Sequence, residues 1–314
     1  MKTNNNIPAY RFQGYTDAWE LRKLGEVVYR SNLTSSSKDL PRLEFEDINS
    51  GLGTLNKDIS QKVDDRKGLE FNEGDVLFGK LRPYLKNWWY AEFKGIALGD
   101  FWNLKSDLWH SCFLYTYIQS NSFQLVANDT SGTKMPRSDW NLVAESIAKF
   151  PSFPEQTAIG TFFSTLDRHI TLHQRKLDMF KEQKKTYLKL LFPAKGQTQP
   201  ALRFQGFEDD WKEVKLGEVA KMYQPQTITG GDLIEEGIPV FGANGYIGYY
   251  SDCNHVTDQV TISARGEGTG TPNFVKAPVW ITGNSMVINV DENKDLDKKF
   301  LYSNFLAYDF KKYV

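Results

Sequence analysis

Two short motifs in the chain resemble phosphate-binding loops, and both depart from the pattern that binding needs. Gly74–Leu81 fits G-x-x-x-x-G-K-[ST] except at Leu81, which has no hydroxyl to hold Mg²⁺. Gly266, Gly268 and Gly270 have the spacing G-x-G-x-G, which is not the dinucleotide-binding spacing, and no helical pattern follows them. We interpret the middle of the first motif as a strand and the second motif as a turn.

Two triplets, Glu92-Phe-Lys94 and Glu213-Val-Lys215, match the E-x-K core of many metal-dependent nucleases. Such triplets are common by chance, and no Pro-Asp pair precedes either one. The chain also has no Asn-Pro-Pro-aromatic tetrapeptide of an amino-methyltransferase and no G-x-S-x-G. The sequence therefore predicts a binding protein with no catalytic residues. A DNA-cleaving enzyme that uses Glu92 and Lys94 stays open as an alternative.

The cysteines and histidines do not form a metal-binding pattern. Cys112 and Cys253 lack the spacing of metal ligands and cannot build a disulfide framework. His169 and His173 would share one face of a helix, but no further ligands lie near them in the sequence. We expect no metal site and no disulfide.

Length and composition are those of a folded protein of about two domains. The chain has 314 residues, of which 40% are hydrophobic and 14% aromatic. Its N-terminus has no apolar signal sequence, and no apolar run approaches the ~20 residues that cross a bilayer. Together with the cysteine count, this predicts a protein of a reducing cytoplasm.

The sequence repeats itself once. Pro8–Val27 (PAYRFQGYTDAWELRKLGEV) and Pro200–Val219 (PALRFQGFEDDWKEVKLGEV) are identical at 13 of 20 positions, with an offset of 192 residues. This period is too long for a solenoid unit and predicts two tandem domains of similar build. Trp19 and Trp211 occupy equivalent positions, and we expect both in domain cores.

A long helix is predicted between the two copies. Pro154 and Glu155 suit the first turn of a helix, Pro193 and Gly196 end it, and residues 155–191 would span about 55 Å. Positions spaced alternately by four and three residues form a heptad seam in which His173 and Lys184 are the two polar members. The apolar and aromatic seam residues are Ile159, Phe163, Leu166, Ile170, Leu177, Phe180, Tyr187 and Leu191.

This seam favours pairing with another helix, and an amphipathic helix packed on one domain is the alternative. Residues 168–195 carry eight Lys/Arg and two Asp/Glu, and six of the basic residues lie off the seam: Arg168, Arg175, Lys176, Lys181, Lys185 and Lys189. They are either a solvated face or a surface for phosphates.

Short apolar stretches separated by turns predict strands and short helices in both domains. They include Val76–Phe78 and Cys112–Ile118 in the first copy and Ile238–Phe241, Val260–Ser263 and Ser285–Val290 in the second. The predicted fold class is α/β (α+β), with a first domain at 1–150, a coiled-coil helix at 151–196 and a second, incomplete domain at 197–314.

Two repeated units with a long heptad helix after the first resemble the specificity subunits of type I restriction-modification systems. Phe12–Val27, which recurs at Phe204–Val219, resembles the opening of their target recognition domains. Gly74–Leu85 (GDVLFGKLRPYL) is similar to one class of these domains. The resemblance covers nearly the whole chain.

Two further stretches support the resemblance. Ser131–Pro136 followed by Phe150–Gln156 is similar to the family's entry into its long helix. Val260–Gly266 stands where Val76–Arg82 stands in the first copy.

The resemblance implies that each recognition domain reads one half of a split site in double-stranded DNA. Paired helices would set the spacing between the half-sites, and methylase subunits would dock around those helices and methylate adenine. A motor-nuclease subunit would join for restriction. S-adenosylmethionine, ATP and Mg²⁺ would be used by these partner subunits, and the specificity subunit itself would bind none of them.

The chain departs from the family plan near its C-terminus. Phe113-Leu-Tyr115 matches Phe300-Leu-Tyr302, so that Val314 corresponds to Ala127 and 68 residues have no second copy. We therefore expect a C-terminally truncated specificity subunit whose second helix is missing. The helix at 155–191 would then find its partner in another chain, a second copy being the simplest case.

The resemblance also directs attention to basic and aromatic residues near predicted loops. Arg and Lys read guanine edges, and other basic residues contact phosphates. The candidates after the strand at Val76–Phe78 would share one side of an extended segment. The candidate DNA-binding residues are Lys80, Arg82, Tyr84, Lys86, Lys134 and Arg137 in the first domain and Arg265 in the second. Ordinary solvated charges are the alternative for each, and a helical assembly scaffold without DNA contact is the alternative for the whole chain.

Overall fold

The computed structural model describes residues 6–130 and 134–308. Ser131–Thr133, part of the predicted entry into the long helix, and Val314 lie outside these residues. The chain divides into two compact units, residues 1–174 and 175–314, and the division falls within the long helix α5 (Phe153–Leu190). The boundaries 1–150, 151–196 and 197–314 remain a prediction. Both units mix helices and strands, which confirms the predicted fold class.

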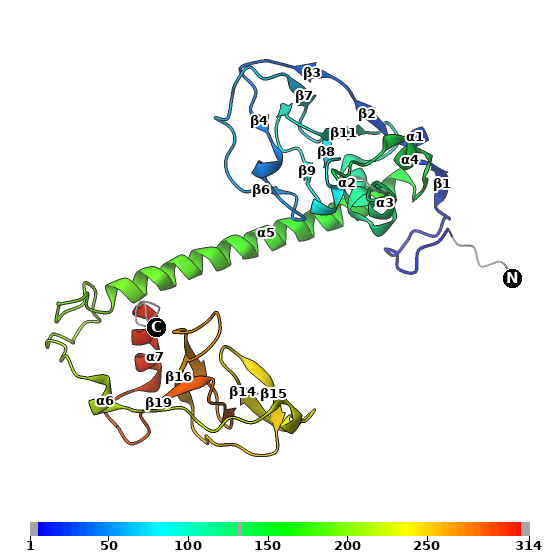
Figure 1. The fold of residues 1–314 in the computed structure, drawn as a ribbon. Coiled ribbons are helices and arrows are strands. Elements are labelled where there is room, and N and C mark those ends of the chain that lie inside the picture. The colour runs from blue at the N-terminus through cyan, green and yellow to red at the C-terminus, as the bar shows by residue number, and fades with distance from the viewer. Residues whose placement is uncertain (1–5, 131–133, 309–314) are drawn as a thin grey trace. The chain divides into compact units, whose positions relative to one another are not determined.

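Two four-stranded sheets form the centre of the first unit (Figure 1). One sheet has the antiparallel order β2 (Tyr29–Ser31), β11 (Phe101–Lys105), β8 (Val76–Gly79) and β9 (Trp88–Tyr90). The other has the order β3 (Thr34–Ser35), β7 (Gly68–Phe71), β10 (Gly95–Ala97) and β4 (Arg42–Leu43), with β10 and β4 parallel. Two shorter pairs are β5 (Ile48–Asn49) with β6 (Thr54–Leu55), and β1 (Glu20–Lys23) with β12 (Ile147–Phe150).

Strand β8 lies in the core because its residues are apolar on both faces. Side chains alternate across a strand, so Val76 and Phe78 join one apolar cluster while Leu77 joins another. The first cluster is closed by the short helices of this unit, and Phe78 stacks on Trp102 of β11 within it. The helices are α1 (Leu24–Val27), α2 (Ser111–Gln119), α3 (Asn121–Ala127) and α4 (Trp140–Glu145).

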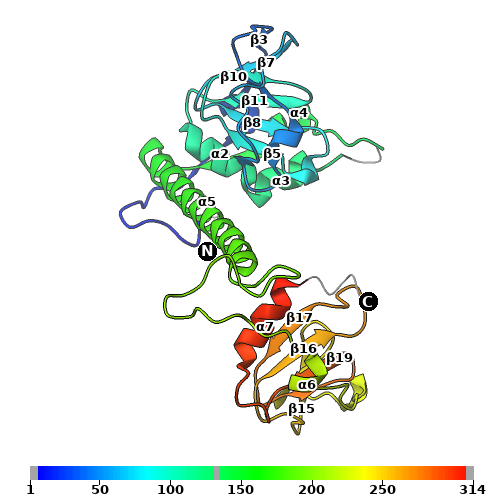
Figure 2. The same ribbon diagram turned by 90° about the vertical axis from the view of Figure 1, so that its left-hand side faces the viewer.

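The larger sheet of the second unit repeats the strand order of the antiparallel sheet of the first unit, and its smaller sheet has three strands instead of four. Its larger sheet has the order β13 (Lys221–Tyr223), β19 (Ser285–Asn289), β16 (Gln259–Ser263) and β17 (Pro272–Val275). Its smaller sheet has the order β15 (Tyr246–Tyr250), β14 (Ile238–Phe241) and β18 (Trp280–Ile281), with β14 and β18 parallel. Helices α6 (Leu216–Val219) and α7 (Lys298–Ala307) correspond to α1 and α2, and α7 packs beside β16 and β17 (Figure 2). The predicted tandem repeat is therefore present in the fold.

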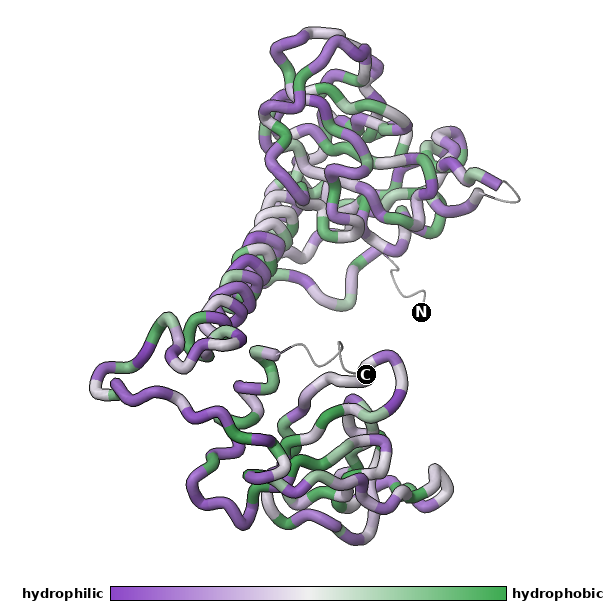
Figure 3. The backbone as a smooth tube through the Cα atoms, turned by 60° about the vertical axis from the view of Figure 1, so that its left-hand side comes forward, coloured by the Kyte–Doolittle hydropathy of each residue, from purple (hydrophilic) through white to green (hydrophobic). Residues whose placement is uncertain are grey.

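Helix α5 extends over 38 residues, close to the predicted range of 155–191. Hydrophobic and hydrophilic residues recur in short stretches along it (Figure 3). Ile159 packs on the core of the first unit, and Leu191 follows the end of the helix. The other six predicted seam residues, from Phe163 to Tyr187, are 40–58% exposed. Among the described residues, no helix is both long and apolar enough to cross a membrane.

Candidate DNA interface

The loop between β8 and β9, residues 80–87, does not have the predicted extended shape. Pro83–Leu85 form a 3-10 turn, and Arg82 and Lys86 on either side of it have φ values of 49° and 57°. Left-handed backbone is uncommon for residues with a Cβ and is kept only where the surrounding structure holds it. The expectation that Lys80, Arg82, Tyr84 and Lys86 share one side of an extended strand is therefore wrong. Arg82, Tyr84 and Lys86 are nevertheless all exposed.

Neighbouring segments hold the β8–β9 loop in this conformation. The Arg82 N–H donates to the Pro136 carbonyl at 2.8 Å, and the Gly51 N–H donates to the Lys86 carbonyl at 2.9 Å. The Ser50 hydroxyl donates to the Asn87 side-chain oxygen at 2.9 Å. The loop, the turn between β5 and β6, and the segment that follows Lys134 therefore form one continuous surface.

The predicted basic residues of this surface fall into two groups. Lys80 and Arg137 both contact Asp100, with N–O distances of 3.5 and 3.0 Å. Within residues 6–130 and 134–308, no carboxylate forms an ion pair with Arg82 or Lys86. Lys134 is exposed, and among these residues it has no carboxylate partner either. Arg82, Lys86 and Lys134 are thus the cations that remain available to an anionic ligand, while Lys80 and Arg137 fix the loop to Asp100.

The corresponding loop of the second unit, residues 264–271 between β16 and β17, carries Arg265. Its side chain is exposed and has no carboxylate partner among the described residues. Gly266 and Gly270 at φ 83° and 84° provide the turns that the G-x-G-x-G spacing predicts. Asn244 packs directly against Gly268 and accepts a hydrogen bond from Ser263, so the turn after β14 supports this loop.

The sequence did not identify the turns that lie beside these two loops. In the first unit this is the turn between β5 and β6, where Gly53 has φ 63° and an added Cβ would lie 1.8 Å from the Tyr115 hydroxyl. In the second unit this is the turn after β14, which contains Asn244. Clusters of Gly, Asn and Ser mark turns in a sequence, but only the fold brings these turns next to the basic loops.

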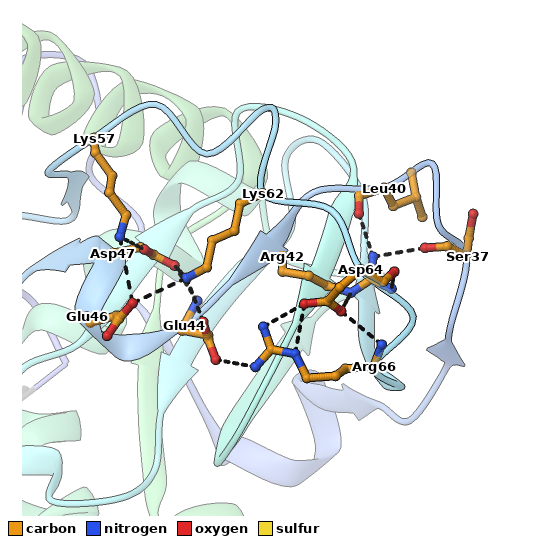
Figure 4. A network of polar contacts seen from close by, with 10 residues as sticks. All are labelled: Ser37, Leu40, Arg42, Glu44, Glu46, Asp47, Lys57, Lys62, Asp64 and Arg66. Carbon is orange, nitrogen blue, oxygen red and sulfur yellow. Dashed lines mark hydrogen bonds and ion pairs between the residues drawn. The ribbon is translucent and has the colours of Figure 1, made fainter.

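A network of charged side chains lies in the first unit, around Asp47 and Lys62 (Figure 4). Buried Asp47 contacts Lys57 and Lys62 at 2.8 and 2.7 Å, and Lys62 also contacts Glu44 at 2.6 Å. Phe45 lies between two members of the network, Glu44 and Glu46. Its ring packs against Gly79 at the end of β8, where an added Cβ would lie 2.5 Å from the ring. The network therefore helps to position the start of the β8–β9 loop.

We expect the first unit to lose stability in acid because of this network. Burial of Asp47 raises its pKa, but hydrogen bonds from Lys57 and Lys62 outweigh burial, so the pKa lies below its ordinary 3.8. Hydrogen bonds from Lys62 and Arg66 lower the pKa of Glu44 below its ordinary 4.5. A carboxylate with a lowered pKa in the folded state stabilises the protein above its unfolded-state pKa, and this stability is lost as the pH falls through the folded value.

Urea unfolding between about pH 3 and pH 6 measures this loss. The double variant Asp47→Asn with Glu44→Gln should be less stable near pH 6 and should show a flatter pH dependence below pH 5. The variant Asp39→Asn changes an exposed carboxylate outside the network and is the control. Equal pH slopes for the double variant and the unchanged protein would contradict the assignment.

The other residues singled out in the sequence are dispersed. Glu92 is exposed and Lys94 pairs with Glu70 at 2.8 Å, while Glu213 and Lys215 are both exposed. Trp19 and Trp211 are half-buried, and Trp211 packs on Phe192 and Phe300. The histidines of α5 are exposed, and Cys112 and Cys253 are free. Among the described residues, no group of three or more His, Cys, Asp and Glu is placed to hold a metal ion.

Comparison with known proteins identifies the second unit. Residues 208–313 match the family described as type I restriction modification DNA specificity domain. The EcoDI specificity subunit of a type I restriction enzyme from Escherichia coli is 30% identical over 91 residues, which is 29% of this chain and 20% of that relative's length.

The fold of the whole chain is also similar to a solved structure. The S subunit of a type I restriction-modification system from M. genitalium has a TM-score of 0.66 at 14% identity, over 98% of this chain and 81% of that one. At this identity the likeness shows the fold, which joins two sheet-containing units through a long helix. Residues 208–313 thus match a type I restriction modification DNA specificity domain, and the chain as a whole has the fold of the M. genitalium S subunit.

Proposed function

We propose that this chain reads a bipartite DNA sequence, with each unit recognising one half-site, and directs adenine methylation and restriction to that site. One observation carries the proposal: the equivalent loops of the two units, β8–β9 and β16–β17, each present an exposed arginine that has no carboxylate partner in residues 6–130 and 134–308. Arginine reads guanine edges or contacts phosphates. In a protein of near-neutral net charge, −1, such local cations would mark where DNA binds.

The partners that we propose follow from this role. Methylase subunits would use S-adenosylmethionine, and a motor-nuclease subunit would use ATP and Mg²⁺, while this chain would bind none of these cofactors. The assembly would work in the cytoplasm, where it reaches chromosomal DNA. The exposed seam of α5 is the surface that we propose for a partner helix, from a methylase subunit or from a second copy of this chain.

Exchange of one domain tests this proposal. Grafting residues 12–150 of another family member onto this chain should change one half of the methylated motif and leave the other half intact, because the reading loops belong to separate units. Mapping methylated adenines in host genomes that carry the original gene, the graft or neither gives the motifs. A change in both halves would contradict separate reading, and DNA cleavage by the purified chain with Mg²⁺ alone would favour a nuclease.

A further inference from the structure

Two buried serines anchor the turn between β14 and β15. Ser263 of β16 and Ser285 of β19 are 1% and 0% exposed and lie opposite each other in the larger sheet of the second unit. The Ser285 hydroxyl donates to the Gly242 carbonyl at 2.8 Å, and the Ser263 hydroxyl donates to the Ala243 carbonyl at 2.6 Å. The turn is therefore fixed to the sheet that carries the β16–β17 loop.

The same hydroxyl orients the side chain of Asn244, the next residue of the turn. Ser263 also donates to the Asn244 side-chain oxygen. The Asn273 amide donates to the Ser263 oxygen at 3.2 Å, so the single hydrogen of the hydroxyl is directed toward its acceptors. The Asn244 oxygen thus faces Ser263, while the Asn244 amide nitrogen has no hydrogen-bond partner within residues 6–130 and 134–308.

Close packing with the β16–β17 loop also holds Asn244. A Cβ added to Gly268 of this loop would lie 2.1 Å from the Asn244 amide nitrogen. Gly268 does not have the positive φ of Gly266 and Gly270, so its contribution is the space that it leaves for Asn244. Asn244 itself is exposed. An oriented amide with free N–H groups is therefore presented to solvent beside the loop that carries Arg265.

The first unit shows that a bond of this type can be made by a buried amide. There the Ser50 hydroxyl donates to the Asn87 side-chain oxygen at 2.9 Å and joins the β5–β6 turn to the β8–β9 loop. Asn87 is only 6% exposed. Holding a turn against a loop thus explains the bond between Ser263 and Asn244, but it does not require that the Asn244 amide be exposed.

We propose that Asn244 reads an adenine in the half-site of the second unit, next to the contact made by Arg265. This inference rests on the proposed function. Asparagine recognises adenine by donating to N7 and accepting from the N6 amino group. The amide oxygen has two lone pairs, so the bond from Ser263 leaves one for the base. Guanine presents the O6 acceptor instead of an amino group and would oppose the Asn244 oxygen.

The isosteric variant Asn244→Asp tests this assignment. It keeps the acceptor for Ser263 and the shape beside Gly268 but removes both N–H donors. The original chain in complex with its methylase should require an A·T pair, other than the methylated one, in the second half-site. Replacement of this pair should weaken binding at least about fivefold, and the Asp variant should lose the preference at this pair alone. Gly268→Ala should reduce the same preference, because its Cβ would displace Asn244.

Maps of methylated adenines, together with binding to duplexes changed at one pair at a time, give these preferences. Gln197→Glu is the control, because it makes an amide-to-carboxylate change at an exposed position of the second unit outside the turn and the loop. It should leave the motif unchanged. Thermal unfolding of the Asn244→Asp chain should match that of the original chain and so exclude misfolding.

Three results would overturn the role of Asn244 and leave the proposed function standing. One is an unchanged motif and affinity in the Asn244→Asp complex, and another is a second half-site without such an A·T pair. The third is an equal loss of affinity for all sequences, which would assign Asn244 to a phosphate. Absence of any sequence-specific methylation by the original complex would instead contradict the proposed function and this inference together.

Discussion

Replacement of Arg42 by methionine is expected to lower the free energy of unfolding of the first unit by at least about 3 kcal/mol, because each hydrogen bond to a charged group contributes about 1.5–3 kcal/mol. Arg42 is fully buried, and its guanidinium lies 3.1 Å from Asp64. It donates to the backbone carbonyls of Ser37, Leu40 and Asp64. Methionine would fill much of the space but would leave these three acceptors without their donor.

Urea unfolding near neutral pH measures this effect. Arg22 provides the matched control, because it pairs with Glu20 on the surface at 3.0 Å, and exposed pairs contribute about 0–1 kcal/mol. Arg42→Lys would keep the charge but could not reach the same acceptors, and it should be destabilising as well. If Arg42→Met unfolds at the same urea concentration as Arg22→Met, the guanidinium does not hold this part of the fold together.

The sequence could not have predicted the role of Arg42. It stands in a polar stretch, and nothing distinguishes it from the exposed arginines, because its acceptors come from loops up to 22 residues away. The β8–β9 loop was misjudged for a similar reason. The sequence predicts an extended segment after Val76–Phe78, whereas contacts with Pro136 and Gly51, far apart in the sequence, hold a tight turn with left-handed residues.

Features that depend on periodicity or repetition were predictable. The heptad spacing predicted α5 to within a few residues of its observed ends, since a helix this long is specified by its own sequence. The match of Pro8–Val27 to Pro200–Val219 predicted two units of similar build, and the common strand order of their larger sheets confirms it. The same internal alignment led to Arg265. However, a sequence cannot show which charges are paired, as Lys80 and Arg137 are with Asp100.

The difference between paired and unpaired cations leads to a second large expected effect. Arg82→Ala should weaken DNA binding by the assembled complex by about 1–3 kcal/mol and relax one base position of the first half-site, if Arg82 contacts a base edge. Arg265→Ala should do the same in the other half-site only, because its loop belongs to the second unit. Loss of a phosphate contact would instead weaken binding to all sequences alike and make its salt dependence shallower.

Arg22→Ala is the matched control, since Arg22 is an exposed arginine of the first unit that is paired with Glu20 and lies outside the β8–β9 loop. Binding measured at several salt concentrations, together with maps of methylated adenines, separates these outcomes. The proposed interface requires that Arg82→Ala and Arg265→Ala each alter affinity or motif and that their motif changes fall in different halves. Two variants that bind and methylate like the unchanged complex would leave both arginines as solvated charges, and the DNA surface would then lie elsewhere on the two units.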